Sequence, residues 1–312
     1  APDATVLVCQ NSCGAEVYGY PVLSHLTPRP TSFGRLDGIA KTLVFKMRRR
    51  MGIELSYDDR MRLAEFLKVH GVTKVLAEYG PVGMMVYDLC DRMKLPLYVY
   101  FHGHDASALV RQPRFRKAYA RMLPKVTGVF AASQHLIDNL APLGCPIERS
   151  PVIPCGSDIA SFELGVPEPG RIFALGRLAE KKAPHLTIRA FGRIAAAFPQ
   201  AHLDLVGAGA LLDACEQEIR TAKPEGRVTL HGAQPRSYWE PLLRRAAIFA
   251  QHSVTAADGD TEGSPVATNE AMATGLPVVA TRHAGIRRQV VEGVTGSLVA
   301  DGEGGAPGHS QT

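Results

Sequence analysis

Long apolar runs are missing from this 312-residue sequence: no stretch approaches the about 18 apolar residues of a membrane-spanning helix, so we expect no such helix. The opening residues, "APDATVLVCQ", lack the basic segment and apolar core of a secretory signal. Hydrophobic residues make up 46% and charged residues 21% of the sequence, which is typical of a globular protein. We therefore expect a cytoplasmic protein that is long enough for two domains.

Paired cysteine motifs are also missing. The six cysteines are scattered along the chain, and none belongs to a CxxC pair. Cys9 and Cys13 are near each other in sequence, but no nearby histidine completes a metal-binding set with them. This pattern is typical of reduced thiols in a cytosolic protein, so we predict no metal centre.

A strong charge of either sign is absent, because the formal net charge is only +5. Residues 1–160 contain 20 Lys and Arg against 14 Asp and Glu, whereas the remainder contains 15 against 16. The excess is small, and no recognition motif for nucleic acid accompanies it. We therefore expect no nucleic acid among the partners.

Short apolar, β-branched runs alternate with helical patterns, as in parallel sheets that helices cover on both faces. A stretch with two prolines and two glycines, residues 157–170, separates two such series. We predict an α/β protein with two Rossmann-like domains, residues 1–160 and 161–312, the second ending in a mobile Gly-rich tail from Asp301. The expected strands are residues 6–9, 74–78, 97–101, 128–131 and 152–154, then 172–175, 202–206, 228–231, 247–250, 276–280 and 297–299.

The residues that follow each strand are candidates for a binding site, because ligands of open parallel sheets bind beyond the carboxyl ends of the strands. "GRLAEKK" follows strand 172–175, and Gly176 permits a tight turn there. Arg177, Lys181 and Lys182 then supply cations that suit a diphosphate, although a solvated helix start has the same composition. "GAGALL", after strand 202–206, is either an anion-binding turn or a plain strand-to-helix connection.

Two carboxylates flank a turn in "DGDTEGSPVATNEAMATGLPVVA". Glu262 precedes Gly263, Ser264 and Pro265, which we place at the start of a helix whose free amides favour a negative group. Glu270 comes later in the same helix. Each carboxylate can accept two hydroxyls, as a vicinal diol offers, whereas the simpler explanation is surface charge.

These segments together resemble the retaining glycosyltransferases of glycosyltransferase family 4, which have the GT-B fold. "EGSPVATNEAMATGLPVVAT" is similar to their E-x7-E region, and "GRLAEKK", "GAGALL", "VTLHGAQP" and "VVEGVTGSLV" fall in the family's order. In the first half, "AEYGPVG" and "FHGHDAS" resemble members that build bacterial polysaccharides. The resemblance covers roughly residues 74–300 and implies two domains that face a central cleft.

The resemblance implies transfer of a hexose, with retention of configuration, from a nucleotide-sugar donor to a saccharide or lipid-linked acceptor. It implies neither a metal nor a cofactor, because Arg and Lys take the place of a metal ion. Glu270 would bind the ribose and Glu262 the donor sugar, while Arg177 and Lys182 would neutralise the departing diphosphate; the family's spacing favours Lys182 over Lys181. The other implied donor-binding residues are Gly176, Gly263, Ser264 and Pro265.

The acceptor side of the resemblance is carried by "FHGHD" after strand 97–101. His102 matches the histidine that faces the reacting sugar, and the alternative is a loop histidine with a packing role. His104 is the second candidate, and Asp105 is expected to fix the loop.

The sequence also departs from the family. It has "AGIRRQ", with Arg287 and Arg288, where the family has Ile-Pro-Glu after the glycine. The family's opening strand and Gly-rich loop either correspond to "VLVCQNSCGAE", with Gly14, or are missing, and closing helices expected after Val299 are missing. The resemblance thus predicts a fold incomplete at both termini. The alternatives to an active transferase are a non-catalytic or truncated nucleotide-sugar-binding protein and another GT-B enzyme, such as a sugar-nucleotide epimerase.

Two basic segments raise the question of a membrane. "AKTLVFKMRRRMG" places apolar residues beside five cations, and residues 106–137 contain six bases and no acid. Docking on the anionic inner face of a membrane, which suits a lipid-linked acceptor, is one interpretation, and a solvated basic face is the other.

Overall fold

The computed structural model describes residues 7–8, 16–17, 20–23, 55, 57–222 and 226–300. The chain divides into two compact units, which are treated separately below: Ala1–Ala131 with Leu136–Ile153, and Ala132–His135 with Pro154–Thr312. Gly14, the segment "AKTLVFKMRRRMG" and the tail from Asp301 lie outside the described residues.

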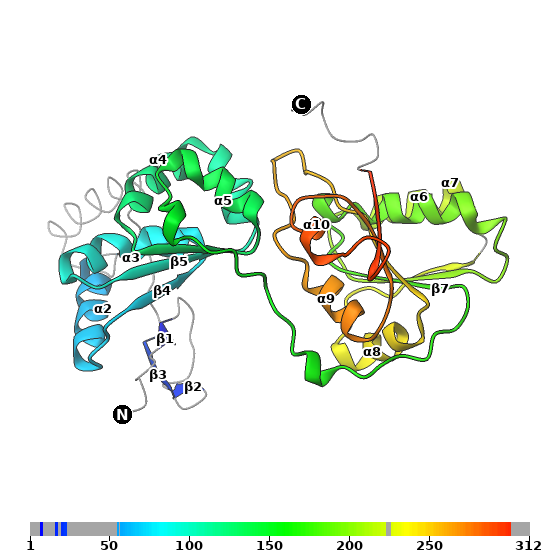
Figure 1. The fold of residues 1–312 in the computed structure, drawn as a ribbon, viewed down its shortest axis with the longest axis horizontal. Coiled ribbons are helices and arrows are strands. Elements are labelled where there is room, and N and C mark those ends of the chain that lie inside the picture. The colour runs from blue at the N-terminus through cyan, green and yellow to red at the C-terminus, as the bar shows by residue number, and fades with distance from the viewer. Residues whose placement is uncertain are drawn as a thin grey trace, which may run out of the picture. The chain divides into compact units, whose positions relative to one another are not determined.

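A parallel sheet with the order β4-β5-β6 forms the centre of the first unit. In β5 the side chains alternate, so that Leu97, Val99 and Phe101 are buried, as expected for a strand with two different faces. Helix α3 contacts β4, β5 and α4, and α2 contacts α3 (Figure 1). The elements are α2 (Tyr57–Val69), β4 (Val75–Glu78), α3 (Gly80–Met93), β5 (Leu97–Phe101), α4 (Pro113–Met122), β6 (Gly128–Ala131) and α5 (Gln134–Leu140).

A small second sheet has the order β1-β3-β2. Strand β1 (Leu7–Val8) corresponds to the expected strand 6–9, and it pairs in parallel with β3 (Tyr20–Leu23). Strand β2 (Glu16–Val17) pairs antiparallel with β3. The sequence did not predict β2 or β3, because both lie in a stretch of mixed polar and apolar residues without a clear two-residue period.

The prediction of a strand at residues 152–154 is wrong. Val152 forms only an isolated bridge with Ala131. Pro151 and Pro154 flank this bridge, and proline has no amide hydrogen for the ladder. Strand pairing therefore cannot extend in either direction, although the amide of Ile153 donates to the carbonyl of Ala131.

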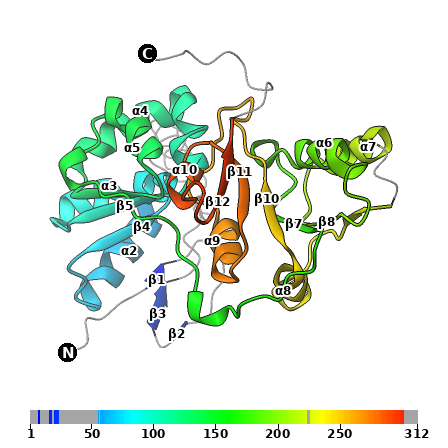
Figure 2. The same cartoon turned by 45° about the vertical axis from the view of Figure 1, so that its right-hand side comes forward.

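The second unit is built on six parallel strands in the order β12-β11-β10-β7-β8-β9 (Figure 2). The chain adds β8 and β9 on one side of β7, then returns to the other side and adds β10, β11 and β12. The strand order therefore reverses between β7 and β10, which is where such sheets open a ligand crevice. The strands are β7 (Arg171–Leu175), β8 (His202–Val206), β9 (Val228–Leu230), β10 (Ile248–Gln251), β11 (Val278–Thr281) and β12 (Gly296–Val299).

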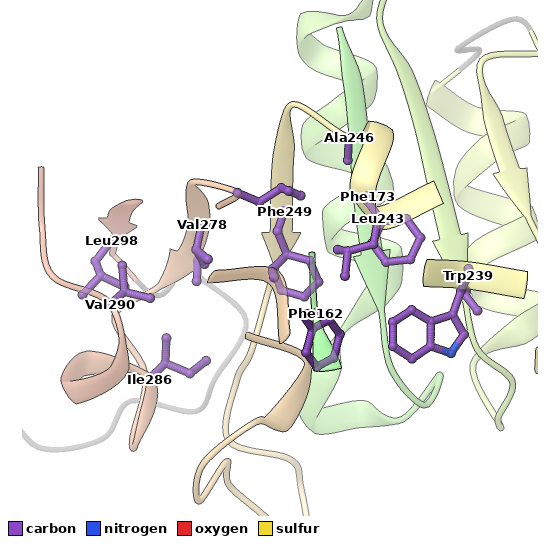
Figure 3. Packing of buried hydrophobic residues seen from close by; sticks show 14 residues of the cluster. Phe162, Phe173, Trp239, Leu243, Ala246, Phe249, Val278, Ile286, Val290 and Leu298 are labelled. Carbon is purple, nitrogen blue, oxygen red and sulfur yellow. The ribbon is translucent and has the colours of Figure 1, made fainter. Parts of the chain in front are cut away.

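Helices cover both faces of this six-stranded sheet. Alternate residues of β7 point to opposite faces: Phe173 belongs to one core cluster and Ala174 to the other. Figure 3 shows the first cluster, in which Phe173 and Phe249 come from adjacent strands and lie above Phe162 in this view. The helices are α6 (Pro184–Ala195) and α7 (Leu212–Ala222), which contribute to the second cluster, and α8 (Arg236–Arg245), α9 (Val266–Ala273) and α10 (Ile286–Gln289), which contribute to the first.

The stretch between the two series of strands, residues 157–170, packs onto the second unit. Phe162 is buried in the core, and the guanidinium of Arg236 lies 4.0 Å from the centre of its ring. The amide of Gly165 donates to the carbonyl of Thr274. A Cβ at Gly165 would come within 2.2 Å of the Arg244 carbonyl oxygen, so glycine is required for this close approach.

Candidate functional site

A pocket lies at the point where the strand order reverses, beyond the carboxyl ends of β7 and β10. It is open to solvent, and the space along its lining, open solvent included, is about 290 Å³. Gly176 and Arg177 enter it from the turn after β7, and Lys182 from the short helix that follows. The lining residues are Ala174, Leu175, Gly176, Arg177, Lys182, Pro184, Thr187, Leu205, Ala250, Gln251 and His252.

Backbone packing explains the glycines of "GAGALL". A Cβ at Gly207 would lie 1.9 Å from the Gly176 carbonyl oxygen, and one at Gly209 would lie 2.5 Å from that of Leu178. The amide of Leu178 donates to the carbonyl of Ala208 at 2.9 Å. Of the two interpretations, this geometry favours a connection that packs against the pocket turn and fixes its shape.

Lys181 and its neighbour Glu180 hold the loop that leads to Glu262. The carboxylate of Glu180 accepts the amide of Ala257 at 2.8 Å. Lys181 Nζ lies 3.1 Å from Asp260 Oδ2 and donates to the Thr261 carbonyl at 3.4 Å. The Lys181 side chain is 10% exposed. Lys181 therefore binds the loop before Glu262, and this is a physical reason for preferring Lys182 as the phosphate ligand.

Lys182 faces the pocket and also approaches Glu262. Lys182 Nζ lies 3.1 Å from Glu262 Oε1, so the two side chains form an ion pair. Burial lowers the pKa of Lys182 from 10.5, and the negative charge of Glu262 opposes that shift. An anion in the pocket would add a second negative neighbour, so the buried ammonium provides a driving force for anion binding.

Arg177 differs from the two lysines because its side chain is exposed. Within residues 57–222 and 226–300, no carboxylate lies within ion-pair distance of its guanidinium. The fork of an arginine can bind two phosphate oxygens at once. Arg177 and Lys182 thus place two cations at one pocket, of which the arginine is ready to bind a ligand without breaking an existing ion pair.

The turn at Gly263, Ser264 and Pro265 leads into α9, with Pro265 at the N-cap position. Gln289 on α10 binds this turn, because its side-chain amide donates to Ser264 Oγ at 3.0 Å and to the Pro265 carbonyl at 3.2 Å. Gly285 approaches even closer: a Cβ there would lie 1.5 Å from the Gly263 carbonyl oxygen. The segment around "AGIRRQ" therefore supports the turn that follows Glu262.

Glu270 lies on α9, outside the residues that line the pocket. Burial raises the pKa of its carboxyl above 4.5, Arg236 opposes this effect, and Glu240 reinforces it. The two modulating charges are on α8, the helix that follows β9. A partly buried carboxylate with a raised pKa is suited to accept hydroxyl groups from a ligand.

His102 belongs to the first unit, at the carboxyl end of β5. Asp105 fixes its loop, as the sequence predicted: Asp105 Oδ1 accepts the amides of His102 and Gly103, and Oδ2 accepts that of Gly80. His104 is exposed. The imidazole of His102 instead meets Glu78, with 2.6 Å between Nε2 and Oε2.

The structure thus brings Gly176, Arg177, Lys182 and Glu262 together in the second unit. Gly263, Ser264 and Pro265 follow directly in the chain. Sequence reasoning missed Gln251 and His252, which line the same pocket from the end of β10. The rule that ligands bind after parallel strands could have found them, because they follow the predicted strand 247–250 immediately.

Solved structures with a similar fold include a named glycosyltransferase. The structure of Anabaena Alr3699/HepE in complex with UDP superposes with a TM-score of 0.68, covering 91% of this chain and 74% of that one, at 20% identity. The lipopolysaccharide outer core galactosyltransferase WaaB, in its apo form, gives a TM-score of 0.63 over 92% of this chain and 72% of that one, at 16% identity. The chain has the GT-B fold.

Sequence comparison agrees with the fold. Residues 17–161 match the model described as Glycosyltransferase Family 4, and residues 158–304 match that described as Glycosyl transferases group 1. The chain is 34% identical to the amylovoran biosynthesis glycosyltransferase AmsK of Erwinia amylovora, over 65% of this chain and 51% of that protein. It is 30% identical to the putative colanic acid biosynthesis glycosyltransferase WcaL of Salmonella typhimurium, over 73% of this chain and 58% of that protein.

By fold and by sequence, the chain is therefore similar to GT-B glycosyltransferases. It spans about half the length of the curated relatives that it matches. Among the described residues, none of the helices is both long and apolar enough to cross a membrane.

Proposed function

We propose that this protein is a retaining hexosyltransferase that uses a nucleotide-sugar donor in the synthesis of a bacterial polysaccharide. One observation carries the proposal: Arg177 and Lys182 meet in one pocket at the strand reversal, with Glu262 beside Lys182. This arrangement suits a donor whose diphosphate lies on the cations and whose sugar hydroxyls reach the carboxylate. The named relatives and the UDP-bound neighbour support the same reading.

Charge development explains why these cations would promote the reaction. The bond from the sugar to the diphosphate breaks in the transition state, and negative charge accumulates on the leaving phosphate. Fixed cations stabilise that charge more strongly than the charge of the bound donor, so they lower the barrier. The proposed enzyme therefore needs neither a metal ion nor a cofactor, since Arg177 and Lys182 supply the positive charge.

Glu270 provides the test of the donor site. A thermal-shift screen with UDP-, GDP- and ADP-sugars first identifies the donor, because a ligand that binds the folded state raises the melting temperature. Glu270→Ala is then expected to weaken binding of the matching nucleotide by about 1–3 kcal/mol, the usual cost of losing a hydrogen bond to a charged group. Calorimetric titration measures the difference.

Because the pKa of Glu270 is raised, the affinity for the nucleotide should also depend on pH. The ionised carboxylate accepts two ribose hydroxyls, and its protonated form accepts them less well. Because burial raises this pKa above 4.5, affinity should fall as pH decreases through the raised value. Glu270→Gln should lack this dependence. Glu216→Ala, an exposed helix glutamate of the same unit, is the matched control; equal affinity in Glu270→Ala and Glu216→Ala would remove Glu270 from the site.

An anionic membrane surface and a lipid-linked acceptor belong to the proposal as well, with the protein in the cytoplasm. Arg114, Arg116, Lys117 and Arg121 are exposed on α4, whereas Tyr119 is buried on its other face. Vesicles with phosphatidylglycerol should therefore carry the protein upward in a flotation gradient at low salt, and vesicles of phosphatidylcholine alone should not. The double variant Arg116→Glu with Lys117→Glu should abolish this flotation, whereas the control Arg193→Glu on α6 should not. Flotation that does not decrease at high salt would contradict docking on an anionic surface.

A further inference from the structure

Three oxygen atoms surround the side-chain nitrogen of Gln289, the last residue of α10. Ser264 Oγ and Asn269 Oδ1 lie 3.0 Å from this nitrogen, and the carbonyl oxygen of Pro265 lies 3.2 Å from it. Asn269 extends the network, because its own side-chain nitrogen donates to the carbonyl of Cys155 at 2.9 Å. A chain of hydrogen bonds thus runs from Cys155 through α9 and α10 to the turn at Ser264.

Groups that can only accept fix the direction of each hydrogen bond. The carbonyl of Cys155 requires the nitrogen of the Asn269 amide, so the Asn269 oxygen faces Gln289. The carbonyl of Pro265 likewise requires the nitrogen of the Gln289 amide. An amide nitrogen accepts no hydrogen bond, so the Ser264 hydroxyl can only accept in its contact with Gln289.

The Ser264 hydroxyl therefore keeps its own proton for another partner. Ser264 is 8% exposed, and none of the described residues accepts this proton. Buried hydroxyls normally find a partner for their proton, so an unused one at a binding turn indicates a place for an acceptor atom of a ligand. Glu262, two residues earlier, offers only acceptor atoms as a carboxylate. The turn thus presents one proton and one carboxylate to a ligand.

Core packing does not explain why a glutamine stands at position 289. The Oε1 atom of Gln289 is buried and meets no donor within the part of the chain that the structure describes. A buried carbonyl oxygen without a donor costs stability, and an apolar side chain such as leucine would avoid that cost. The amide is therefore explained by the contacts of its nitrogen, which hold the Ser264 hydroxyl as an acceptor.

We propose that Gln289, held by Asn269, is a positioning residue that keeps the proton of the Ser264 hydroxyl directed at the bound nucleotide sugar. The group that Ser264 recognises is an oxygen atom without a proton, on the sugar or on the diphosphate, whereas Glu262 recognises a hydroxyl. The identity of the ligand rests on the proposed transferase function. The direction of the hydroxyl rests on the hydrogen bonds alone.

A double-mutant cycle, measured by calorimetric titration of the full chain, tests this role. The probes are UDP-glucose, GDP-mannose and ADP-glucose, of which at least one should bind. Ser264→Ala should weaken that binding by about five- to tenfold, as expected for one lost hydrogen bond. Gln289→Glu should weaken it by at least as much, because a carboxylate accepts the Ser264 proton and withdraws it from the ligand.

The two substitutions should not act independently. In the Ser264→Ala protein, the further loss caused by Gln289→Glu should be at least about threefold smaller than in the unchanged protein, because the proton that it withdraws is already absent. Repulsion between the new carboxylate and the ligand acts in both backgrounds and cancels in the comparison. If Gln289→Glu does not fold, the uncharged Gln289→Leu replaces it: it leaves the Ser264 hydroxyl free to turn, and its loss should also be smaller in the Ser264→Ala protein.

Gln217→Glu, the same change at an exposed position of α7, is the matched control and should bind normally. Titration with the matching nucleoside diphosphate locates the recognised oxygen: Ser264→Ala should lower this affinity if the oxygen is on the diphosphate and leave it unchanged if the oxygen is on the sugar.

Equal losses from Gln289→Glu in both backgrounds, or normal binding by Ser264→Ala, would overturn the proposal and leave the donor site intact. Coupled losses in a protein that transfers no sugar would retain the positioning role and contradict only the transferase function. If none of the three probes binds, both the positioning role and the donor site are wrong.

Discussion

Arg177→Ala is expected to reduce the turnover of the proposed transfer by about 10²–10³-fold, the usual effect of removing one charge stabiliser from a transition state. The guanidinium lines the pocket without an ion pair to any described carboxylate. Its loss therefore removes a positive charge that lines the pocket and breaks no ion pair with a described carboxylate. Release of nucleoside diphosphate from the donor that the thermal-shift screen identifies measures the rate.

Two further variants sharpen the interpretation of that result. Arg177→Lys retains the charge but loses the two-pronged geometry, so it should recover only part of the rate. Arg193→Ala removes an exposed arginine near the end of α6 and should leave the rate unchanged. Because Arg177 is exposed, its substitution should also leave the melting temperature within a few degrees of the original value. Normal turnover in Arg177→Ala would show that the pocket is not the donor site.

The sequence predicted the strands of the second unit well, because each is a short apolar run between turn residues. The six strands described in the second unit all overlap the expected ones, although β10 and β11 each end one residue later than their patterns indicated. The rule that ligands bind beyond the carboxyl ends then led directly to Gly176, Arg177 and Lys182. Local pattern was sufficient here, since the pocket is formed by residues that follow strands.

Contacts between distant segments could not be predicted in the same way. Nothing in "GRLAEKK" distinguishes the lysine that binds Asp260 from the one that faces the pocket, because they are adjacent and chemically identical. The structure separates them through a partner 79 residues away in sequence. The same holds for Glu78, whose carboxylate contacts a histidine 24 residues later, just after the next strand. Pairing of this kind is a property of the packed sheet.

The segment "AGIRRQ" supports the turn that follows Glu262, so a substitution within this segment should have a large effect. Gly285→Ala should destabilise the second unit by about 3 kcal/mol, at the upper end of the usual cost of overpacking. The added Cβ would lie 1.5 Å from the carbonyl oxygen of Gly263, and backbone atoms cannot move aside as a flexible side chain can. Thermal and chemical denaturation measure the loss.

Gly156→Ala is the matched control for this experiment. Neither glycine has a positive φ, so the two substitutions do not differ in backbone strain. A Cβ at Gly156 would meet nothing within 4 Å, so stability should change by no more than about 0.5 kcal/mol. Any folded Gly285→Ala protein should also bind the donor nucleotide more weakly than Gly156→Ala, because relief of the clash moves the turn that carries Glu262. Equal stability in the two variants would contradict the close packing of Gly285 on the turn at Gly263. The segment "AGIRRQ" would then not have the supporting role assigned to it.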